Sequence, residues 1–187
     1  MYTKLAPSCL ALLAFASLPA NFALAQNPPQ PQRSTPATVV VAAETAYAIG
    51  AQRSGVTNCV PRINQVTSFL TTNAVHSGIV MNSQGAVINQ KLVAAVFEAQ
   101  GQAGGLPSLV SASFAPGPGA NECSATYDAI TYWPNGCNQV ATQGFGGFKP
   151  VQPLGKNVFT LEGGPLVKVF LMPAGTGCIS VKKEVVF

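Results

Sequence analysis

Apolar and polar residues alternate through most of the stretch from Asn157 to Phe187. Two clusters of turn-forming residues, Gly163-Gly164-Pro165 and Pro173-Ala174-Gly175-Thr176-Gly177, interrupt this alternation. The apolar residues fall at odd-numbered positions: Phe159, Leu161, Val167, Val169, Leu171, Ile179, Val181, Val185 and Phe187. A period of two broken by Gly and Pro predicts consecutive antiparallel strands, with these positions buried and the other face wetted.

Three earlier stretches also favour strands. Cys123–Trp133 is rich in Thr, Tyr and Ile, and Leu109–Phe114 follows a Gly-rich turn. Gly85–Gly101 fits either a helix or a strand, and we favour a strand near Leu92–Glu98 because another strand-like segment follows it. Gln143–Gly155 is rich in Gly and Pro and is expected to be a loop. No internal repeat is evident.

One helix is predicted from about Asn58 to Thr72. Thr57 or Asn58 can cap it, Pro61 falls in the first turn, and apolar residues recur at helical spacing. The stretch Val39–Ile49 fits an edge strand or a short helix, ended in either case by Gly50. The sequence therefore predicts one α+β domain over residues 39–187, with an N-terminal helix packed on a mainly antiparallel sheet.

The first 25 residues have the features of a secretory signal peptide. Lys4 precedes an apolar run from Cys9 to Leu18, and Ala23-Leu24-Ala25 forms a small-residue cleavage site. The run is too short to be a comfortable membrane span, and residues 26–38 are predicted to be a Pro/Gln-rich disordered tail. We therefore expect a periplasmic or secreted protein with no membrane span in the mature chain.

Four cysteines remain after the signal peptide: Cys59, Cys123, Cys137 and Cys178. An even number in an exported chain predicts two disulfides, for which three pairings are possible. We favour Cys123–Cys137, which closes a local loop, together with Cys59–Cys178. No Cys-x-x-Cys pair is present, so neither a zinc ribbon nor a thioredoxin-like redox site is indicated.

The residue types of catalysis are scarce. His76 is the only histidine, and a serine triad would need an activated serine and an acid beside it. Ser77 is adjacent in sequence, but no G-x-S-x-G motif is present, and a surface or helix-end histidine is the favoured interpretation. The carboxylates after the signal peptide are isolated along the chain: Glu44, Glu98, Glu122, Asp128, Glu162 and Glu184. Neither a metal site nor a cofactor is expected.

Charge does not indicate a nucleic-acid partner. The whole chain has a formal net charge of +4, but its basic residues are scattered, and only Lys182 and Lys183 are adjacent. Nucleic-acid binding needs clustered basic residues. The sequence therefore leaves a protein or a small ligand as the expected partner.

Aromatic residues supply the candidate contacts. Phe145 and Phe148 lie on a Gly-rich stretch, where they either contact a partner or pack under the loop into the core. In the Cys123–Trp133 strand, Trp133 and Tyr127 share one face and Tyr132 takes the other, so one face is core and the other is a candidate binding surface.

The sequence therefore favours an exported, non-enzymatic binding or interaction protein. One version of this role is to modulate an extracytoplasmic enzyme. One alternative is a small exported hydrolase that uses His76 with Ser77 or a carboxylate pair. The other alternative is a structural subunit of a cell-surface assembly.

Overall fold

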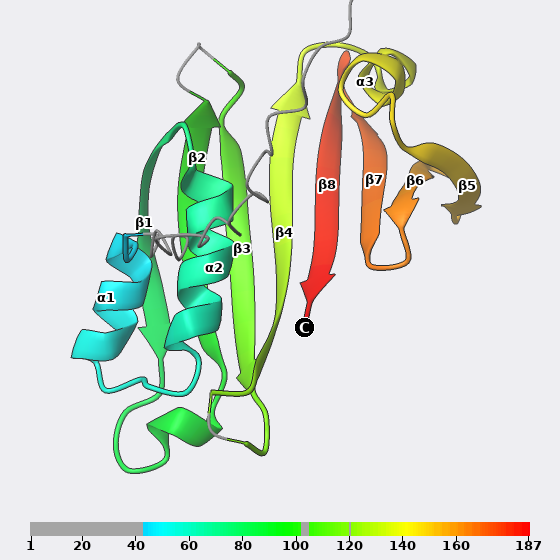
Figure 1. The fold of residues 1–187 in the computed structure, drawn as a ribbon. Coiled ribbons are helices and arrows are strands. Elements are labelled where there is room, and N and C mark those ends of the chain that lie inside the picture. Colours follow the sequence, from blue (N-terminus) through cyan, green and yellow to red (C-terminus); the bar gives the residue numbers. More distant parts are fainter. Residues whose placement is uncertain (1–42, 102–104, 120) are drawn as a thin grey trace, which may run out of the picture. The chain divides into compact units, whose positions relative to one another are not determined.

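The computed structural model describes residues 43–101, 105–119 and 121–187. The predicted signal peptide (1–25) and the predicted tail (26–38) lie outside these residues. Eight antiparallel strands form one sheet in the order β1-β2-β3-β4-β8-β7-β6-β5 (Figure 1). The strands are β1 (Ala74–Asn82), β2 (Val93–Gly101), β3 (Ser108–Pro116), β4 (Cys123–Trp133), β5 (Lys149–Leu154), β6 (Val158–Gly164), β7 (Val167–Ala174) and β8 (Gly177–Val186). The helices are α1 (Ala46–Arg53), α2 (Val60–Thr71), α3 (Cys137–Gln143) and a short 3-10 helix, η1 (Ile88–Gln90). The predicted α+β fold with an antiparallel sheet is confirmed.

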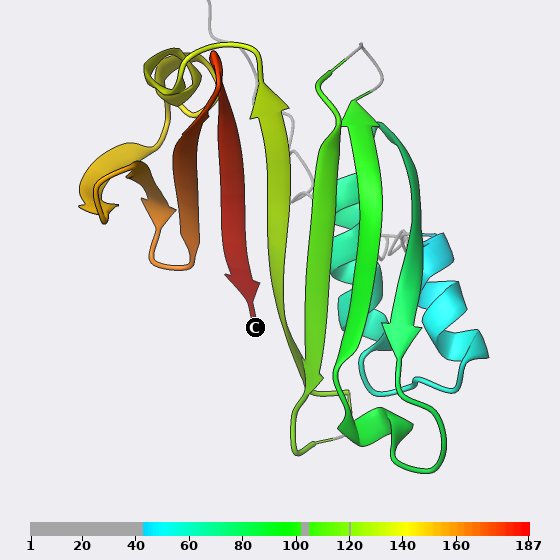
Figure 2. The same cartoon turned by 180° about the vertical axis from the view of Figure 1, so that it is seen from behind.

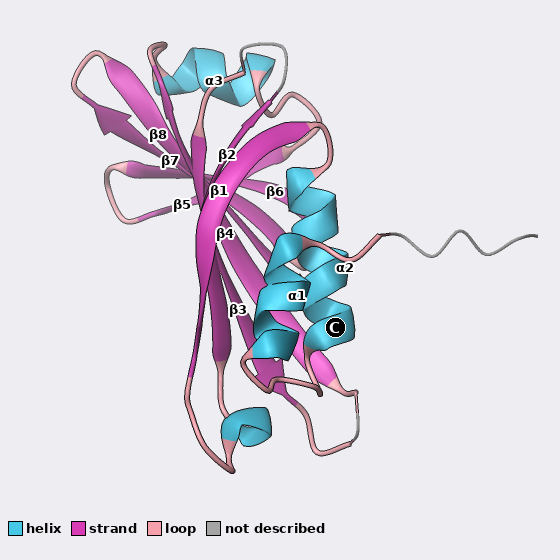
Figure 3. Cartoon of the chain, turned by 90° about the vertical axis from the view of Figure 1, so that its left-hand side faces the viewer, coloured by secondary structure: helices cyan, strands magenta, loops and turns pink. Residues whose placement is uncertain are grey.

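The predicted helix is α2, and α1 lies beside it against the sheet (Figure 3). The predicted cap is wrong, because the N-cap residue of α2 is Cys59 and neither Thr57 nor Asn58 caps it with a side chain. The prediction that Gly50 ends the preceding element is wrong, because α1 runs through Gly50 to Arg53. Thr45 caps α1 by accepting a hydrogen bond from the backbone nitrogen of Ala48, and the chain leaves the helix at Gly55, whose φ is +96°. In the described part of the chain, neither these helices nor any other is long and apolar enough to cross a bilayer.

Five of the six predicted strands coincide closely with β3, β4, β6, β7 and β8, and the favoured strand near Leu92–Glu98 is β2. Strand β1 is not predicted from the sequence, because it contains Ser77 and Gly78 and shows no clear alternation. α3 and β5 are not predicted from the sequence either. A seven-residue helix has little periodicity to detect, and β5 carries two prolines in a stretch that reads as a loop.

The chain contains the same succession of elements twice, although its sequence shows no repeat. A helix is followed by a four-strand meander in the first unit (α2 and β1–β4) and again in the second (α3 and β5–β8). The two meanders join through β4 and β8, which pair antiparallel with Asp128 opposite Lys183. A two-fold rotation normal to the sheet relates two antiparallel strands, so both helices lie on the same face.

Each unit has its own disulfide. Cys59, directly before α2, pairs with Cys123 at the start of β4, and Cys137 at the start of α3 pairs with Cys178 near the start of β8. Two disulfides are thus confirmed, but the favoured pairing is wrong. Cys123 begins β4 and Cys137 lies beyond its other end, about 30 Å away at strand rise, whereas bonded cysteines need Cα atoms within about 7 Å.

Helices cover one face of the sheet and leave the other uncovered (Figures 1 and 2). On the covered face, α1 and α2 pack on β1–β4 around residues such as Phe97, Phe114 and Tyr127, and α3 packs over β6–β8 around Val140 and Leu171. We refer to the uncovered side as the open face.

The predicted burial of odd positions is right for β7, right for Leu161 but wrong for Phe159 in β6, which is 47% exposed, and wrong for β8. Val169 and Leu171 of β7 are buried under α3. In β8 the buried residues are Cys178 and Ser180, so the odd-numbered Ile179 and Val181 lie on the open face. The alternation gave the period correctly, but it does not reveal which face the helices cover.

The two edges of the sheet differ in chemistry. The outer strand β5 is short, exposed along its length and interrupted by a register shift, and it contains Pro150 and Pro153. Proline cannot donate a ladder hydrogen bond, and bulges twist an edge away, so β5 is a poor template for further pairing. The other edge, β1, has nine residues in unbroken register with β2 and contains neither proline nor a Lys, Arg, Asp or Glu residue.

Candidate binding surfaces

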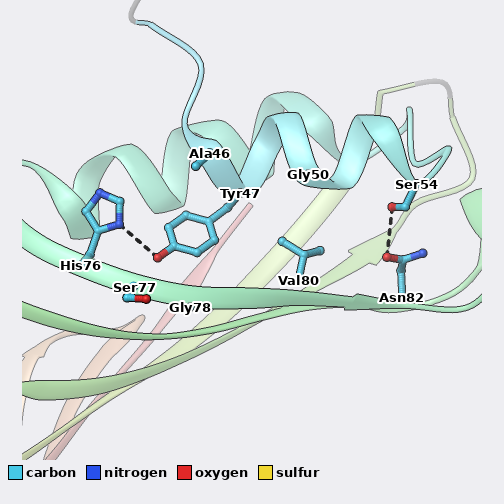
Figure 4. A pocket seen from close by; sticks show the side chains of 9 residues that line it. All are labelled: Ala46, Tyr47, Gly50, Ser54, His76, Ser77, Gly78, Val80 and Asn82. Atoms are coloured by element: carbon cyan, nitrogen blue, oxygen red, sulfur yellow. Dashed lines mark hydrogen bonds between the residues drawn. The ribbon is translucent and has the colours of Figure 1, made fainter.

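The candidate catalytic residues lie on opposite faces of β1. His76 points toward α1, where its Nδ1 lies 3.1 Å from the hydroxyl of Tyr47 and the two rings are 5.5 Å apart (Figure 4). Ser77 points to the open face, because neighbouring strand residues alternate, and it is in register with Glu98. His76 is exposed, as expected, but this strand does not bring the imidazole and the Ser77 hydroxyl together.

Three of the six carboxylates contact lysines. Asp128 pairs with Lys183 at 2.8 Å, Glu184 lies 3.3 Å from Lys182, and Glu162 pairs with Lys168. The other three, Glu44, Glu98 and Glu122, are exposed at separate places in the fold. Among the residues that the structure describes, no group of three or more His, Cys, Asp or Glu side chains could hold a metal ion.

Three of the four candidate aromatic residues pack together at the edge of the hydrophobic core under α3. The ring centroids of Trp133 and Phe145 are 6.0 Å apart, and those of Phe145 and Phe148 are 5.6 Å apart, both in edge-on arrangements. All three rings are partly buried against the residues under α3, and the Trp133 indole donates a hydrogen bond to Ser180 Oγ at 2.8 Å. Their placement matches the alternative that Phe145 and Phe148 complete the core.

Tyr132, the fourth candidate, stands apart from these rings. It lies on the open face with 52% of its surface exposed, whereas Tyr127 on the covered face is buried and Trp133 is partly buried. The predicted division of the β4 aromatics between two faces is therefore confirmed.

Tyr132 belongs to a continuous apolar surface on the open face. In one row across the sheet, Leu109 of β3 pairs with Ile130 of β4, which pairs with Val181 of β8, which in turn pairs with Phe170 of β7. In the next row, Tyr132 pairs with Ile179, and Ile179 with Met172. We refer to these residues as the open-face patch: Leu109, Ile130, Tyr132, Phe170, Met172, Ile179 and Val181.

A second surface is a groove between α1 and the free edge of β1, with a cavity volume of about 460 Å³. Its lining comes from two elements, as Figure 4 shows. The residues that line the groove are Ala46, Tyr47 and Gly50 of α1, Ser54 directly after α1, and His76, Ser77, Gly78, Val80 and Asn82 of β1.

Side-chain hydrogen bonds close the two ends of this groove. Tyr47 meets His76 at one end, and Ser54 Oγ donates to Asn82 Oδ1 at 3.0 Å at the other. The Tyr47 hydroxyl is protonated at neutral pH, as any tyrosine is, and burial raises its pKa further, so it can donate a hydrogen bond. Between these ends the walls carry small or apolar side chains and no Lys, Arg, Asp or Glu.

No protein-family model matches this chain, and neither the curated proteins nor the solved structures contain a match. The two surfaces described above are therefore the starting point for inferring what the protein does.

Proposed function

We propose that this chain is an exported, non-enzymatic binding protein that contacts another protein through the open-face patch. The observation that carries this proposal is an apolar surface on the uncovered side of the sheet. An antiparallel sheet with one solvated face ordinarily carries polar residues there. In this chain, four adjacent strands place aliphatic and aromatic side chains on that face instead.

The form of the patch favours a protein over a small ligand. Leu109 and Tyr132 are 51% and 52% exposed, and both belong to the same broad sheet surface. Small-molecule sites are concave and enclose most of the ligand, whereas contiguous exposed apolar surfaces mark protein–protein contacts. Tyrosine is also among the residues that most often anchor such contacts.

Charged pairs next to the patch supply a polar rim. The Asp128–Lys183 pair lies on the open face, one alternation along β4 and β8 from Ile130 and Val181. Interfaces commonly combine an apolar centre with a polar border, and the border contributes more to specificity than to affinity. The arrangement fits a contact of limited size with a defined orientation.

The disulfides support the exported location. Both connect elements within a unit, and together they use all the cysteines that follow the predicted signal peptide. Disulfides persist in oxidising compartments outside the cytosol. A periplasmic or secreted protein fits this chemistry.

The proposal can be tested by photo-crosslinking in the cells that make the protein. A photoreactive phenylalanine derivative replaces Tyr132, and in a matched control it replaces Leu154, another large exposed side chain (64% against 52% exposed) that lies on β5. We expect a discrete adduct with another protein at position 132 and none at position 154. Failure to form an adduct at position 132, or the same adducts at both positions, would contradict the proposal.

Two other results would favour the alternative functions. An adduct between two copies of this chain would indicate a self-assembling subunit. Hydrolysis of ester or glycoside substrates by the mature protein, abolished in His76→Ala, would indicate an enzyme.

A further inference from the structure

The free edge of β1 offers unpaired backbone hydrogen-bonding groups inside a groove. β1 pairs only with β2 and ends the sheet, so the backbone groups on its outer side have no strand partner among the described residues. Unpaired edges attract further strands, and most natural edges are protected by proline, lysine, bulges or short length. β5 has such protection and β1 does not.

We propose that the α1–β1 groove binds an extended segment of a partner protein, which adds to the sheet as a ninth strand beside β1. This inference rests on the proposed role as a binding protein but not on the open-face patch. Strand addition of this kind takes its affinity from main-chain hydrogen bonds and its specificity from alternate side chains.

The groove has the length that such a strand needs, and its α1 wall carries small side chains. Ala46 and Gly50 place small residues on the α1 wall, and a Cβ built on Gly50 would have only Val80 Cγ2 near it, at 3.8 Å. His76 to Asn82 spans six residue steps, or about 20 Å at strand rise. A single strand can therefore lie along β1 between the two hydrogen bonds that close the groove.

The position of α1 favours one strand over the edge of a second whole sheet. Figures 1 and 2 show α1 lying at and beyond the β1 edge of the sheet. A strand added next to β1 would pass beneath this helix. A second copy of the domain would bring its own α1 to the same place, because an antiparallel pairing of two β1 strands puts both helices on one face.

The surroundings of the edge define the chemistry of the partner segment. The groove lining has no formally charged residue, so burying a charged side chain there would cost free energy without a compensating pair. On the open-face side, β1 presents Val75, Ile79 and Met81, of which Val75 is 70% and Ile79 61% exposed. The partner segment should be uncharged, free of proline, and apolar at alternate positions that pair with this row.

The test uses synthetic peptides of about seven residues in which Thr alternates with Val, Ile or Phe, the spacing that strand addition requires. Each peptide is titrated into the folded mature protein while amide chemical shifts are followed. A matched peptide carries N-methyl groups on alternate backbone nitrogens. This change keeps the side chains and removes the backbone N–H groups that would donate hydrogen bonds to β1. We expect shifts in β1 and α1 for the unmodified peptide and none for the methylated one.

Two variants at one position make the test specific. Gly50→Leu fills the groove, and Gly50→Ala adds only a methyl group at ordinary contact distance. Both remove a glycine from a helix interior, so both should fold at least as well as the parent. We expect Gly50→Leu to weaken peptide binding at least about tenfold, a loss of roughly 1.4 kcal/mol, and Gly50→Ala to change it little.

Several results would overturn the inference. These are no binding by any of the peptides, shifts confined to the open-face patch, equal binding of the methylated peptide, or equal affinity for the Gly50→Leu variant. A concentration-dependent dimer that Gly50→Leu dissociates would assign the edge to a second copy instead. Leu109→Arg separates the two proposals, because in a protein that carries the photoreactive group at position 132 it should abolish adduct formation through the open-face patch and leave peptide binding at β1 intact.

Discussion

The hydroxyl of Tyr127 donates a hydrogen bond to the carboxylate of Glu184, joining β4 to β8 where the two units meet. Lys182 Nζ donates to the same hydroxyl at 3.0 Å and lies 3.3 Å from the carboxylate. Tyr127 is only 1% exposed, so this polar contact is made at the border of the hydrophobic core under α1 and α2. The joint between the units therefore depends on a specific side-chain contact as well as on backbone pairing.

Tyr127→Phe should destabilise the fold without changing its core volume. Hydrogen bonds to charged groups contribute about 1.5–3 kcal/mol, and the substitution also leaves Glu184 with one partner fewer. We expect the free energy of unfolding to fall by about 1.5–3 kcal/mol in urea denaturation. Tyr132→Phe, on the exposed face, is the matched control and should change it by less than about 0.5 kcal/mol. Equal effects of the two substitutions would contradict this role for Tyr127.

The same contact predicts a loss of stability at alkaline pH. Burial, followed by the hydrogen bond and the negative charge of Glu184, raises the pKa of Tyr127 far above its usual value near 10. A raised folded-state pKa gives stability that is fully present below the unfolded pKa and is lost as the pH rises beyond it. The contribution of Tyr127 should therefore keep the urea midpoint constant from neutral pH to about pH 9.5 and make it fall above about pH 10. In Tyr127→Phe the alkaline fall should be shallower, and an unchanged slope would count against the assignment.

Each disulfide should stabilise its own unit. The Cys59–Cys123 and Cys137–Cys178 bonds span sequence separations of 64 and 41 residues. In the loop-entropy account, each closure of this length contributes about 4 kcal/mol by restricting the unfolded chain. The double substitution Cys137→Ser with Cys178→Ser should lower the free energy of unfolding by about that amount.

Hydrogen exchange can locate this effect. Loss of the second disulfide should reduce amide protection first in β6–β8, while β2 and β3 keep theirs under mild conditions. Uniform loss across all strands would show that the two units unfold together.

Gly163 provides a test of whether Phe148 belongs to the core. A Cβ at Gly163 would lie 2.3 Å from Phe148 Cε1, so Gly163→Ala must displace the ring. Overpacking of this kind typically costs about 1–3 kcal/mol. Gly147→Ala is the control, because a Cβ there meets nothing within 4 Å. Trp133 fluorescence should change in the first variant and not in the second, since Trp133 contacts Phe145, which contacts Phe148.

The alternation of residues predicted much of the sheet, because its strongest signals lie in long strands. β4 matches its predicted bounds, and the strands from β6 onward follow the Gly and Pro interruptions. β1 was missed because Ser77 and Gly78 break its pattern, and its position is fixed by pairing with β2. Local sequence carries little information about such pairing.

The candidate sites were harder to predict for the same physical reason. Alternation placed Tyr132 and Trp133 on opposite faces of β4, and the structure bears this out. It could not indicate that Ile179 and Val181 lie beside Tyr132 and Ile130, because that neighbourhood depends on the register between β4 and β8. The groove at β1 depends in addition on a helix that runs through Gly50, a residue that usually weakens helices.

The contrast between β1 and β5 has a consequence for stoichiometry. Growth of a sheet into a filament requires two edge strands that can pair, so that each added subunit offers a free edge to the next one. In this chain the prolines and the register shift of β5 prevent that edge from pairing with a further strand. If the groove at β1 takes up a strand as proposed, the sheet gains one strand there and offers no receptive edge at β5 for another, so any such complex is finite.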